Sequence, residues 1–542
     1  MRFYIENFGC RATQADGAAL ERQFLDKGME RAGAARDAEL VVLNTCTVTA
    51  GADKDARASI RRLQRSNPGC RILVTGCYAQ RAPQELAALP GVTWVVGNSH
   101  KHRAAEIVAG SLSAPAGFVS ITELTAKADG IHSFNKDRET AGQQAQLAPP
   151  GNVVVGDIFA HTELMAAPVF EAANERTRPN LKVQDGCDNR CSFCVIPYVR
   201  GASRSLPLDR VIEEVGALVA TGYREVVISG INLGRWGRDL EASSQFSVFR
   251  PQNGQSENRQ ASTVGGENLR GSSTLSSQPT NPERRTSNEQ RLVHLIRAIL
   301  EGTSLEKLRI SSVEPMDWSD ELIELVASSP RIAKHAHVPM QSGSDAVLRR
   351  MHRKYRPWHY REKVLKIREA MPCAAIGADV MVGFPGESEA EFAETRRMIE
   401  ELPFTYLHVF TYSARPGTPA AEQPGQVPVA VARERNAVLR KIAAAKKAAF
   451  MQSLIGSEVE AITLQTGGTN FTEALTENYL KVKIHGHYEA NRWMNVVVEG
   501  VKDEMMIGLP TFPTASKREA ADSCAPVVTR EYTTGNNCVD LP

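Results

Sequence analysis

The chain has 542 residues, of which 42% are hydrophobic and 23% charged. This length predicts about three domains, because single domains usually run to roughly 100–200 residues. The composition excludes a chain that is disordered or membrane-embedded throughout. The formal net charge is only +2, so a nucleic-acid surface would need local clusters of basic residues.

The start of the chain lacks an apolar run of signal-peptide length. No uninterrupted apolar stretch approaches the ~20 residues that a membrane-spanning helix needs. We therefore expect a cytoplasmic protein with no membrane partner. In a large cytosolic chain, the ten cysteines favour metal or catalytic ligands over disulfides.

The first hundred residues alternate apolar strands with helical patterns, which is typical of a parallel α/β sheet. The predicted strands are 3–8, 40–43, 72–75 and 94–96, and the predicted helices are 18–27 and 52–65. We assign 1–110 to this N-terminal domain. Residues 111–178 are weakly patterned and rich in Ala, Gly, Pro and Gln, which indicates a linker with an insertion.

Strand and helix patterns resume in the central domain, predicted for 179–428. Strand-like runs at 181–183, 225–228 and 308–310 alternate with amphipathic helices, which predicts a partial (β/α) barrel or an open α/β sheet. Residues 241–290 are rich in Ser, Gln, Asn and Gly, and we expect a disordered surface insertion there. Its arginines would also suit nucleic acid, but a solvated loop is the favoured interpretation.

The remaining chain is predicted to hold a basic helix and a small β-barrel within 429–511, followed by a loose tail at 512–542. Short alternating strands at 461–464, 480–484 and 494–498 favour the barrel. The basic residues of the helix would suit phosphate contact, although a solvated helix face also explains them. They are Arg433, Arg435, Arg440, Lys441, Lys446 and Lys447.

The strongest motif is the CxxxCxxC spacing of Cys187, Cys191 and Cys194, directly after an apolar strand. A 4Fe–4S cluster normally takes four thiolates, so three leave one iron open to a small molecule. Zinc is the competing metal, but structural zinc uses four protein ligands, and no fourth Cys or nearby His follows. The iron–sulfur interpretation is therefore favoured.

A second trio, Cys10, Cys46 and Cys77, follows three predicted strands of the N-terminal domain. The carboxyl ends of parallel strands meet at one edge of a sheet, so these thiols predict a second three-cysteine cluster. Cys70 precedes the strand that leads to Cys77, and seven residues at ~3.3 Å each place it at the opposite edge. We do not expect it to be a ligand.

At these cysteines the sequence resembles the radical S-adenosylmethionine methylthiotransferases. The resemblance implies that Cys187, Cys191 and Cys194 hold the catalytic 4Fe–4S cluster that reduces S-adenosylmethionine, and that the N-terminal trio holds a second 4Fe–4S cluster. It also implies cofactor contacts in further family-like segments, each at or after a predicted strand. The contacts expected from them are Gly230, Ser312, Glu314, Gln341, Ser342 and Gly383.

The stretch 473–482 resembles the TRAM domain, a small barrel that holds RNA. Among the family's branches, the stretches 44–49, 53–62, 183–187 and 230–234 resemble the enzymes that act on threonylcarbamoyladenosine in tRNA. One segment departs from the pattern: Arg11-Ala12-Thr13 follows Cys10, where Lys, a small apolar residue and Asn are expected.

The resemblance implies cleavage of S-adenosylmethionine to a 5′-deoxyadenosyl radical and transfer of a methylthio group to carbon 2 of the modified adenosine at position 37. The implied partners are a tRNA anticodon stem-loop and an electron-donor protein such as a flavodoxin or ferredoxin. Isopentenyladenosine tRNA and a ribosomal protein are alternative substrates. A non-catalytic RNA-binding metalloprotein is the more distant alternative.

Overall fold

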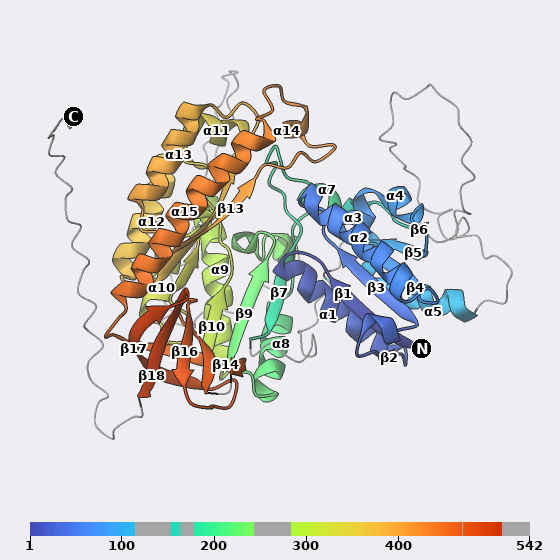
Figure 1. The fold of residues 1–542 in the computed structure, drawn as a ribbon, viewed down its shortest axis with the longest axis horizontal. Helices are drawn as coiled ribbons and strands as arrows, with labels where there is room; N and C mark the ends of the chain where they lie inside the picture. Colours follow the sequence, from blue (N-terminus) through green and yellow to red (C-terminus); the bar gives the residue numbers. More distant parts are fainter. Residues whose placement is uncertain (114–152, 162–163, 165–177, 243–282, 469, 512–542) are drawn as a thin grey trace, which may run out of the picture.

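The computed structural model describes residues 1–113, 153–161, 164, 178–242, 283–468 and 470–511 (Figure 1). They form an N-terminal α/β domain, a central domain of parallel strands and helices, and a C-terminal barrel. This layout confirms the predicted fold class. Among these residues, none of the helices combines the length and apolar character needed to cross a bilayer.

The N-terminal domain is a six-stranded parallel sheet in the order β2-β1-β3-β4-β5-β6. Val41 and Leu43 of β3 point to one face of the sheet, where they pack with Ile60 of α2. Leu40 and Val42 point to the other face, which α1 covers. This alternation follows from the two-residue period of a strand. The strands are β1 (Arg2–Asn7), β2 (Glu30–Arg31), β3 (Leu40–Thr45), β4 (Arg71–Gly76), β5 (Val92–Gly97) and β6 (Val153–Val154), and the helices are α1 (Arg11–Asp26), α2 (Ala50–Ser66), α3 (Cys77–Arg81), α4 (Pro83–Ala87) and α5 (Ala104–Ser113).

The central domain contains two parallel sets of strands, β7-β9-β10 and β11-β12-β13, with β8 antiparallel to β7 at one edge. A parallel bridge between Leu308 and Ile332 links the two sets. The strands are β7 (Asn180–Asp185), β8 (Arg204–Ser205), β9 (Glu225–Gly230), β10 (Lys307–Ile310), β11 (His335–His337), β12 (Ala375–Val382) and β13 (Tyr406–Thr411). The result is the predicted partial barrel.

Helices surround this partial barrel, and their apolar faces form one large core with its strands. Val211, Val215 and Leu218 of α8 are fully buried because their spacing places them on one face of the helix. The helices are α7 (Ile196–Arg200), α8 (Leu208–Ala220), α9 (Glu283–Gly302), α10 (Asp320–Ser328), α11 (Asp345–Arg350), α12 (Pro357–Ala370), α13 (Glu389–Glu401) and α14 (Pro419–Glu422).

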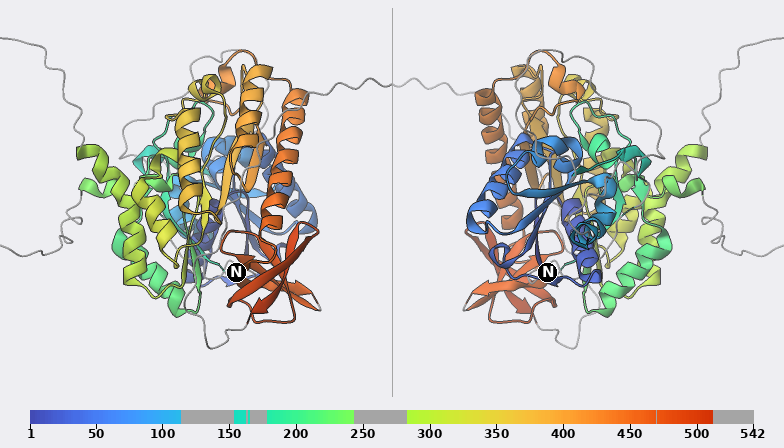
Figure 2. Two further views of the ribbon diagram at one scale, coloured as in Figure 1. Left: turned by 90° about the vertical axis from the view of Figure 1, so that its left-hand side faces the viewer. Right: turned by 90° about the vertical axis from the view of Figure 1, so that its right-hand side faces the viewer.

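A long helix, α15 (Val429–Ser453), leads from the central domain to a closed barrel in the order β14-β15-β16-β18-β17 (Figure 2). The barrel strands are β14 (Glu458–Gly468), β15 (Phe471–Thr476), β16 (Lys481–His485), β17 (Trp493–Lys502) and β18 (Met505–Thr511). Figure 1 places the barrel at the end of the central sheet where β9 and β10 begin.

The structure departs from the predicted element boundaries most clearly at α1, β6 and α9. Helix α1 begins at Arg11, not at 18, because Cys10 already has the extended backbone of an N-cap. Strand β6 adds residues from the predicted linker to the N-terminal sheet. Helix α9 begins at Glu283, inside the predicted 241–290 insertion. Residues 243–282 and 512–542, predicted to be disordered or loose, lie outside the described residues.

A buried ionic cluster joins α1 to the central domain. Asp16 of α1 pairs with Lys101 at 3.0 Å, with Arg200 at 3.0 Å and with Lys182. Asp185 pairs with Lys182 at 2.8 Å and with Arg200 at 2.9 Å. A second junction pairs Arg415 with Asp53 of α2. These contacts hold the N-terminal domain against the central one.

Candidate functional site

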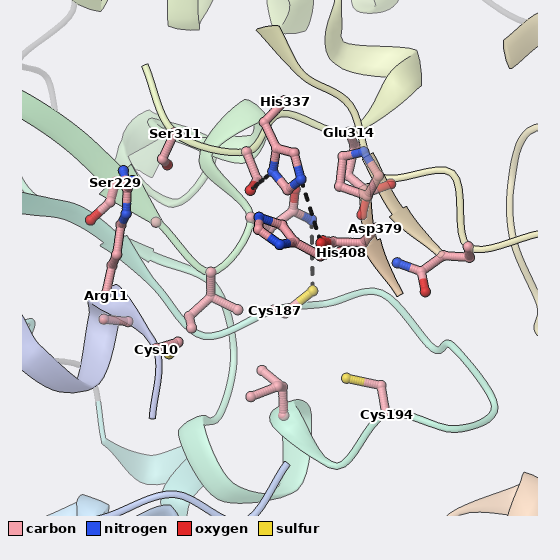
Figure 3. Close-up of a pocket in the computed structure, with 18 of the residues that line it drawn as sticks. Cys10, Arg11, Cys187, Cys194, Ser229, Ser311, Glu314, His337, Asp379 and His408 are labelled. Atoms are coloured by element: carbon pink, nitrogen blue, oxygen red, sulfur yellow. Dashed lines mark hydrogen bonds and ion pairs between the residues drawn. The ribbon is translucent and has the colours of Figure 1, made fainter. Parts of the chain in front are cut away.

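A cavity of about 510 Å³ lies where the three domains meet. Its wall includes Cys10 from the N-terminal domain, the CxxxCxxC cysteines, the carboxyl ends of β9 and β10, and Tyr479 from the barrel. Figure 3 shows Cys10 and Arg11 on one side, Cys187 and Cys194 below, and His337, Asp379 and His408 opposite. The cavity therefore gathers chemistry-bearing residues from regions far apart in the sequence.

Cys187, Cys191 and Cys194 lie in the loop that follows β7. Gly186 starts the loop with φ +71°, and a Cβ there would lie 1.9 Å from the carbonyl oxygen of Ala202, so only glycine fits. Ser192 anchors the loop, because its N–H donates to Met351 at 3.1 Å and its hydroxyl donates to Arg350 at 2.7 Å. All three cysteines face the cavity.

Hydrogen-bond donors surround these thiols. Cys187 Sγ accepts from the backbone N–H of Asn189 at 3.4 Å and from the Asn232 amide at 3.6 Å, and Cys191 Sγ accepts from Arg353 at 3.4 Å. Such donors stabilise the sulfur charge of an iron–sulfur cluster. Burial, assisted by Cys191, raises the pKa of Cys194 to about 12. The thiol is thus neutral until a metal replaces its proton.

Cys10, Cys46 and Cys77 follow β1, β3 and β4, as predicted from the sequence. Gly9 has φ +105°, and a Cβ there would lie 2.7 Å from the Cβ of Cys46, so the missing side chain lets the two loops approach. Gly76 has φ +99° and brings the chain into α3 at Cys77. Cys70 precedes β4 and does not line the cavity.

The environment of this N-terminal trio also suits an iron–sulfur cluster. Cys46 Sγ accepts from the N–H of Val48, and Cys77 Sγ accepts from the Asn98 amide, each at 3.5 Å. Burial, then the neighbouring thiol of Cys77, raises the pKa of Cys46 to about 11. Cys10 contributes in the same direction. In the part of the chain that the structure describes, no three His, Cys, Asp or Glu side chains converge on a single metal-ion position.

Four of the six expected cofactor contacts line the cavity, namely Gly230, Ser312, Glu314 and Gln341. Ser342 and Gly383 do not line it. The Ser342 hydroxyl lies 3.1 Å from the hydroxyl of Thr395, and Gly383 donates its N–H to Glu387 at 2.6 Å. Gly383 also lets α15 pack closely, because a Cβ would lie 2.6 Å from that of Ala432.

Several polar residues of the cavity were not singled out from the sequence. Ser229 Oγ, Asn232 Oδ1 and Ser311 Oγ are buried without a hydrogen-bond partner. Buried polar atoms are normally satisfied, so these atoms indicate a polar ligand in the cavity. Asn232 and Ser311 lie within family-like segments of the sequence, and all three residues lie at the carboxyl ends of β9 and β10, where parallel sheets collect ligands.

The side of the cavity opposite the cysteine loop is aromatic and basic. His335 and His337 of β11 alternate with Ala336 and point inward, and Tyr406 of β13 stacks on both rings. Burial, together with Arg309, holds the pKa of His335 well below its usual value. The lining residues that the sequence analysis did not name individually as contacts include Arg11, Asn189, Phe193, Ser229, Asn232, Ser311, His335, His337, Arg353, Asp379, Tyr406 and His408.

Two of the basic residues of α15 are used structurally. Arg435 is buried and pairs with Glu387 at 2.8 Å, and Lys446 donates to the carbonyl oxygens of Glu400 and Leu402. Arg433, Arg440 and Lys441 are exposed. Only part of the predicted basic helix face is therefore open to phosphate.

Two family models match the chain. The model described as uncharacterized protein family UPF0004 matches residues 2–97, and the radical SAM superfamily model matches residues 181–234 and 276–399. The first match spans all three cysteines of the N-terminal trio. The second spans the cysteine loop, β9 and β10 of the first set of central strands, and β11 and β12 of the second set.

Full-length relatives also resemble the chain. The threonylcarbamoyladenosine tRNA methylthiotransferase MtaB of Aquifex aeolicus is 33% identical over 92% of this chain and 100% of its own length. MtaB of Bacillus subtilis is 33% identical over 89% of this chain and 90% of its own. A tRNA-2-methylthio-N(6)-dimethylallyladenosine synthase of Novosphingobium aromaticivorans is 31% identical over 86% of this chain and 87% of its own.

Proposed function

This chain belongs to the radical S-adenosylmethionine methylthiotransferases, and we propose that it adds a methylthio group to carbon 2 of N6-threonylcarbamoyladenosine at position 37 of tRNA. The observation that carries this proposal is the meeting of Cys10 with Cys187, Cys191 and Cys194 around one cavity. Cys46 and Cys77 do not line this cavity, so the N-terminal trio faces the base through Cys10. The relatives named for the threonylcarbamoyl substrate cover more of the chain than the dimethylallyl relative.

In this proposal Cys187, Cys191 and Cys194 bind one 4Fe–4S cluster, and Cys10, Cys46 and Cys77 bind a second. When bound, the first group supplies the electron that cleaves S-adenosylmethionine, and the second supplies the sulfur that is transferred. Gly230, Ser312, Glu314 and Gln341 bind the cofactor, and Arg353 holds the Glu314 carboxylate in place. Ser342 and Gly383 act indirectly, by shaping the strand ends that carry these contacts.

The chain's own residues orient the reaction and limit access of water. Arg200 belongs to the ionic cluster that fixes α1, and thereby Cys10, against the central domain. Phe193 packs edge-on against Phe384 behind the cysteine loop. A rigid mounting of both trios is required, because a misplacement of about 1 Å can cost two orders of magnitude in rate.

The proposed partner is the anticodon stem-loop of tRNA. A loop nucleotide leaves its stack far more cheaply than a base inside a duplex. The exposed Arg433, Arg440 and Lys441 and the C-terminal barrel are proposed to contact the flanking phosphates. The proposed electron donor is a protein such as a flavodoxin or ferredoxin. We propose that the enzyme acts in the cytoplasm.

The test combines iron analysis with nucleoside analysis. Wild type and the Cys187→Ala/Cys191→Ala/Cys194→Ala variant are reconstituted anaerobically and assayed for iron and sulfide. The variant should keep about half of the iron and lose S-adenosylmethionine cleavage. Wild type should form the methylthio derivative of threonylcarbamoyladenosine in tRNA.

The matched control is the Cys10→Ala/Cys46→Ala/Cys77→Ala variant. It should keep the other half of the iron and still cleave S-adenosylmethionine, without forming methylthio product. Loss of all iron in either variant would contradict two separate sites. Modification of dimethylallyladenosine tRNA, or of a ribosomal protein, in place of the threonylcarbamoyl substrate would overturn the substrate assignment.

A further inference from the structure

Arg11 is a cation in the cavity wall that has no carboxylate partner among the described residues. Its guanidinium donates to the hydroxyl of Tyr479 at 2.9 Å, and it lies over the Tyr479 ring at 5.8 Å. Among the other polar groups of the wall, Arg353 pairs with Glu314, and the His337 ring lies 3.4 Å from the Asp379 carboxylate. Figure 3 shows Arg11 extending from α1 toward Ser229. Arg11 is thus available to an anion in the cavity.

Tyr479 belongs to the turn between β15 and β16 of the C-terminal barrel. Its backbone has φ +67°, a conformation that bulky residues rarely adopt without a reason. The strained turn inserts the Tyr479 ring among Arg11, Arg178 and Arg309, whose guanidinium carbons lie 5.4–5.8 Å from the ring centroid. The barrel therefore fixes the position of Arg11.

The charge balance around this ring is positive. Glu225 pairs with both Arg309 at 2.6 Å and Arg178 at 3.6 Å, which leaves three guanidinium groups for one nearby carboxylate. Burial by itself would raise the pKa of Tyr479, but Arg11 and Arg178 outweigh this effect and lower it. A carboxylate bound here would enter a favourable electrostatic environment.

We propose that Arg11, positioned by Tyr479, binds the carboxylate of the threonylcarbamoyl group and so determines the substrate specificity of the enzyme. The inference rests on the proposed function and names the group that recognises this substrate. The threonyl part of the modified base carries a carboxylate, and a guanidinium is the side chain best suited to bind one. A dimethylallyl group would leave Arg11 unpaired in the cavity, which penalises that substrate.

The first test changes the ligand and leaves the protein intact. Binding of the reconstituted full chain is measured with four anticodon stem-loop RNAs, carrying threonylcarbamoyladenosine, its carboxyl methyl ester, dimethylallyladenosine or unmodified adenosine. We expect the free acid to bind about ten- to a hundredfold more tightly than the ester, because a charged hydrogen bond is lost. Equal binding of acid and ester would overturn the proposal.

The second test changes the protein. Arg11→Gln should bind the acid and the ester equally, whereas Arg11→Lys should retain most of the discrimination because it keeps the charge. Tyr479→Phe should weaken discrimination less than Arg11→Gln, since only the positioning contact is removed. Arg36→Gln, at an exposed site of the N-terminal domain, is the matched control and should behave as wild type.

Iron and sulfide content report whether Arg11→Gln disturbs the neighbouring Cys10, and Tyr479→Phe lies on another domain and avoids that risk. If wild type discriminates the acid but Arg11→Gln and Tyr479→Phe discriminate equally well, this inference fails and the proposed function stands. If wild type instead prefers a dimethylallyladenosine stem-loop, the proposed function itself fails.

Discussion

The two cysteine trios occupy the same molecule but are built in opposite ways. Cys187, Cys191 and Cys194 lie within one eight-residue loop after β7, whereas Cys10, Cys46 and Cys77 follow three strands that only the folded sheet brings together. The three cysteines of the loop are held close together by one short stretch of the chain. The N-terminal trio depends on sheet register, on glycine turns and on the position of α1, so the two sites should respond differently to the same kind of damage.

Substitution of the buried Asp16 should test this difference most severely. Asp16→Asn leaves Lys182 and Arg200 with Asp185 as their remaining carboxylate in the buried cluster, and it removes the carboxylate partner of Lys101. We expect the free energy of unfolding to fall by about 3–5 kcal/mol, as measured by urea unfolding. Iron at the N-terminal trio should be lost before iron at the loop trio.

The control for this substitution is Arg103→Gln, which breaks the exposed pair with Glu106 and should cost less than about 1 kcal/mol. A variant Asp16→Asn as stable as Arg103→Gln would show that the ionic cluster does not hold α1 in place.

Replacement of Gly9 should damage only the N-terminal trio. A Cβ at Gly9 would meet the Cβ and sulfur of Cys46 at 2.7 and 3.0 Å, and the backbone has φ +105°. Gly9→Ala should therefore cost about 2–4 kcal/mol of stability and lower the iron bound by Cys10, Cys46 and Cys77. Iron analysis in the Cys187→Ala/Cys191→Ala/Cys194→Ala background measures this loss.

Gly28→Ala provides the matched comparison, because Gly28 has φ +72° but nothing within 4 Å of its Cβ position. Gly28→Ala should lose only the stability that the positive φ costs an alanine, and its iron content should be normal. If Gly9→Ala and Gly28→Ala bind iron equally, the close approach of the loops at Gly9 and Cys46 does not determine the geometry of the N-terminal trio.

Acid should weaken the junction on which the N-terminal trio depends. Burial by itself would raise the pKa of Asp16, but Lys101, Lys182 and Arg200 outweigh it and hold the pKa well below its usual range. A carboxyl group whose pKa is lower in the folded state than in the unfolded state stabilises the fold at a pH above its unfolded-state pKa. This stabilisation is lost as the pH falls toward its folded-state pKa. We expect a loss of about 1–2 kcal/mol between roughly pH 5 and pH 3.

Urea unfolding of the metal-free protein across this pH range measures the loss. Asp185 should contribute in the same direction, because its pKa is also lowered: burial would raise it, and Arg200 and Lys182 overcome that effect. A wild type whose stability is flat over this range would contradict the assignment of charged forms in the cluster.

The smallest effect on iron binding is expected when a single hydrogen-bond donor to a cysteine sulfur is removed. Asn98 donates to Cys77 and Asn232 donates to Cys187, at 3.5 and 3.6 Å. Asn98→Ala should lower iron affinity about tenfold at the N-terminal trio, and Asn232→Ala should do so at the loop trio. Competition with an iron chelator measures both. A loss at both sites from either variant would mean that the trios are not independent.

The sequence was sufficient for the alternation of strands and helices, since β3, β4, α8 and α15 are long and strongly patterned. It also predicted that the six cysteines of the two trios follow parallel strands, and each of them follows its strand in the structure. The start of α1 at Arg11 was not predicted, since neither Cys10 nor the residues after it carry a strong helix-start signal.

The polar and basic walls of the cavity could not be predicted in the same way. His335, His337 and Arg353 become neighbours of the cysteine loop only after the central strands pack. Tyr479 could equally have been a core residue of the barrel. The role of Tyr479 depends on how the barrel packs against the central domain. No local pattern in the sequence encodes this packing.

The turn at Tyr479 has a consequence for how the three domains work together. The side chain that fixes Arg11 comes from the domain proposed to grip RNA. Any RNA that shifts the barrel also shifts a wall of the cavity, so docking of the nucleic acid and fitting of the base are thermodynamically linked. A tRNA that binds the barrel poorly would therefore also bind its base poorly in the cavity, even when that base carries the correct modification.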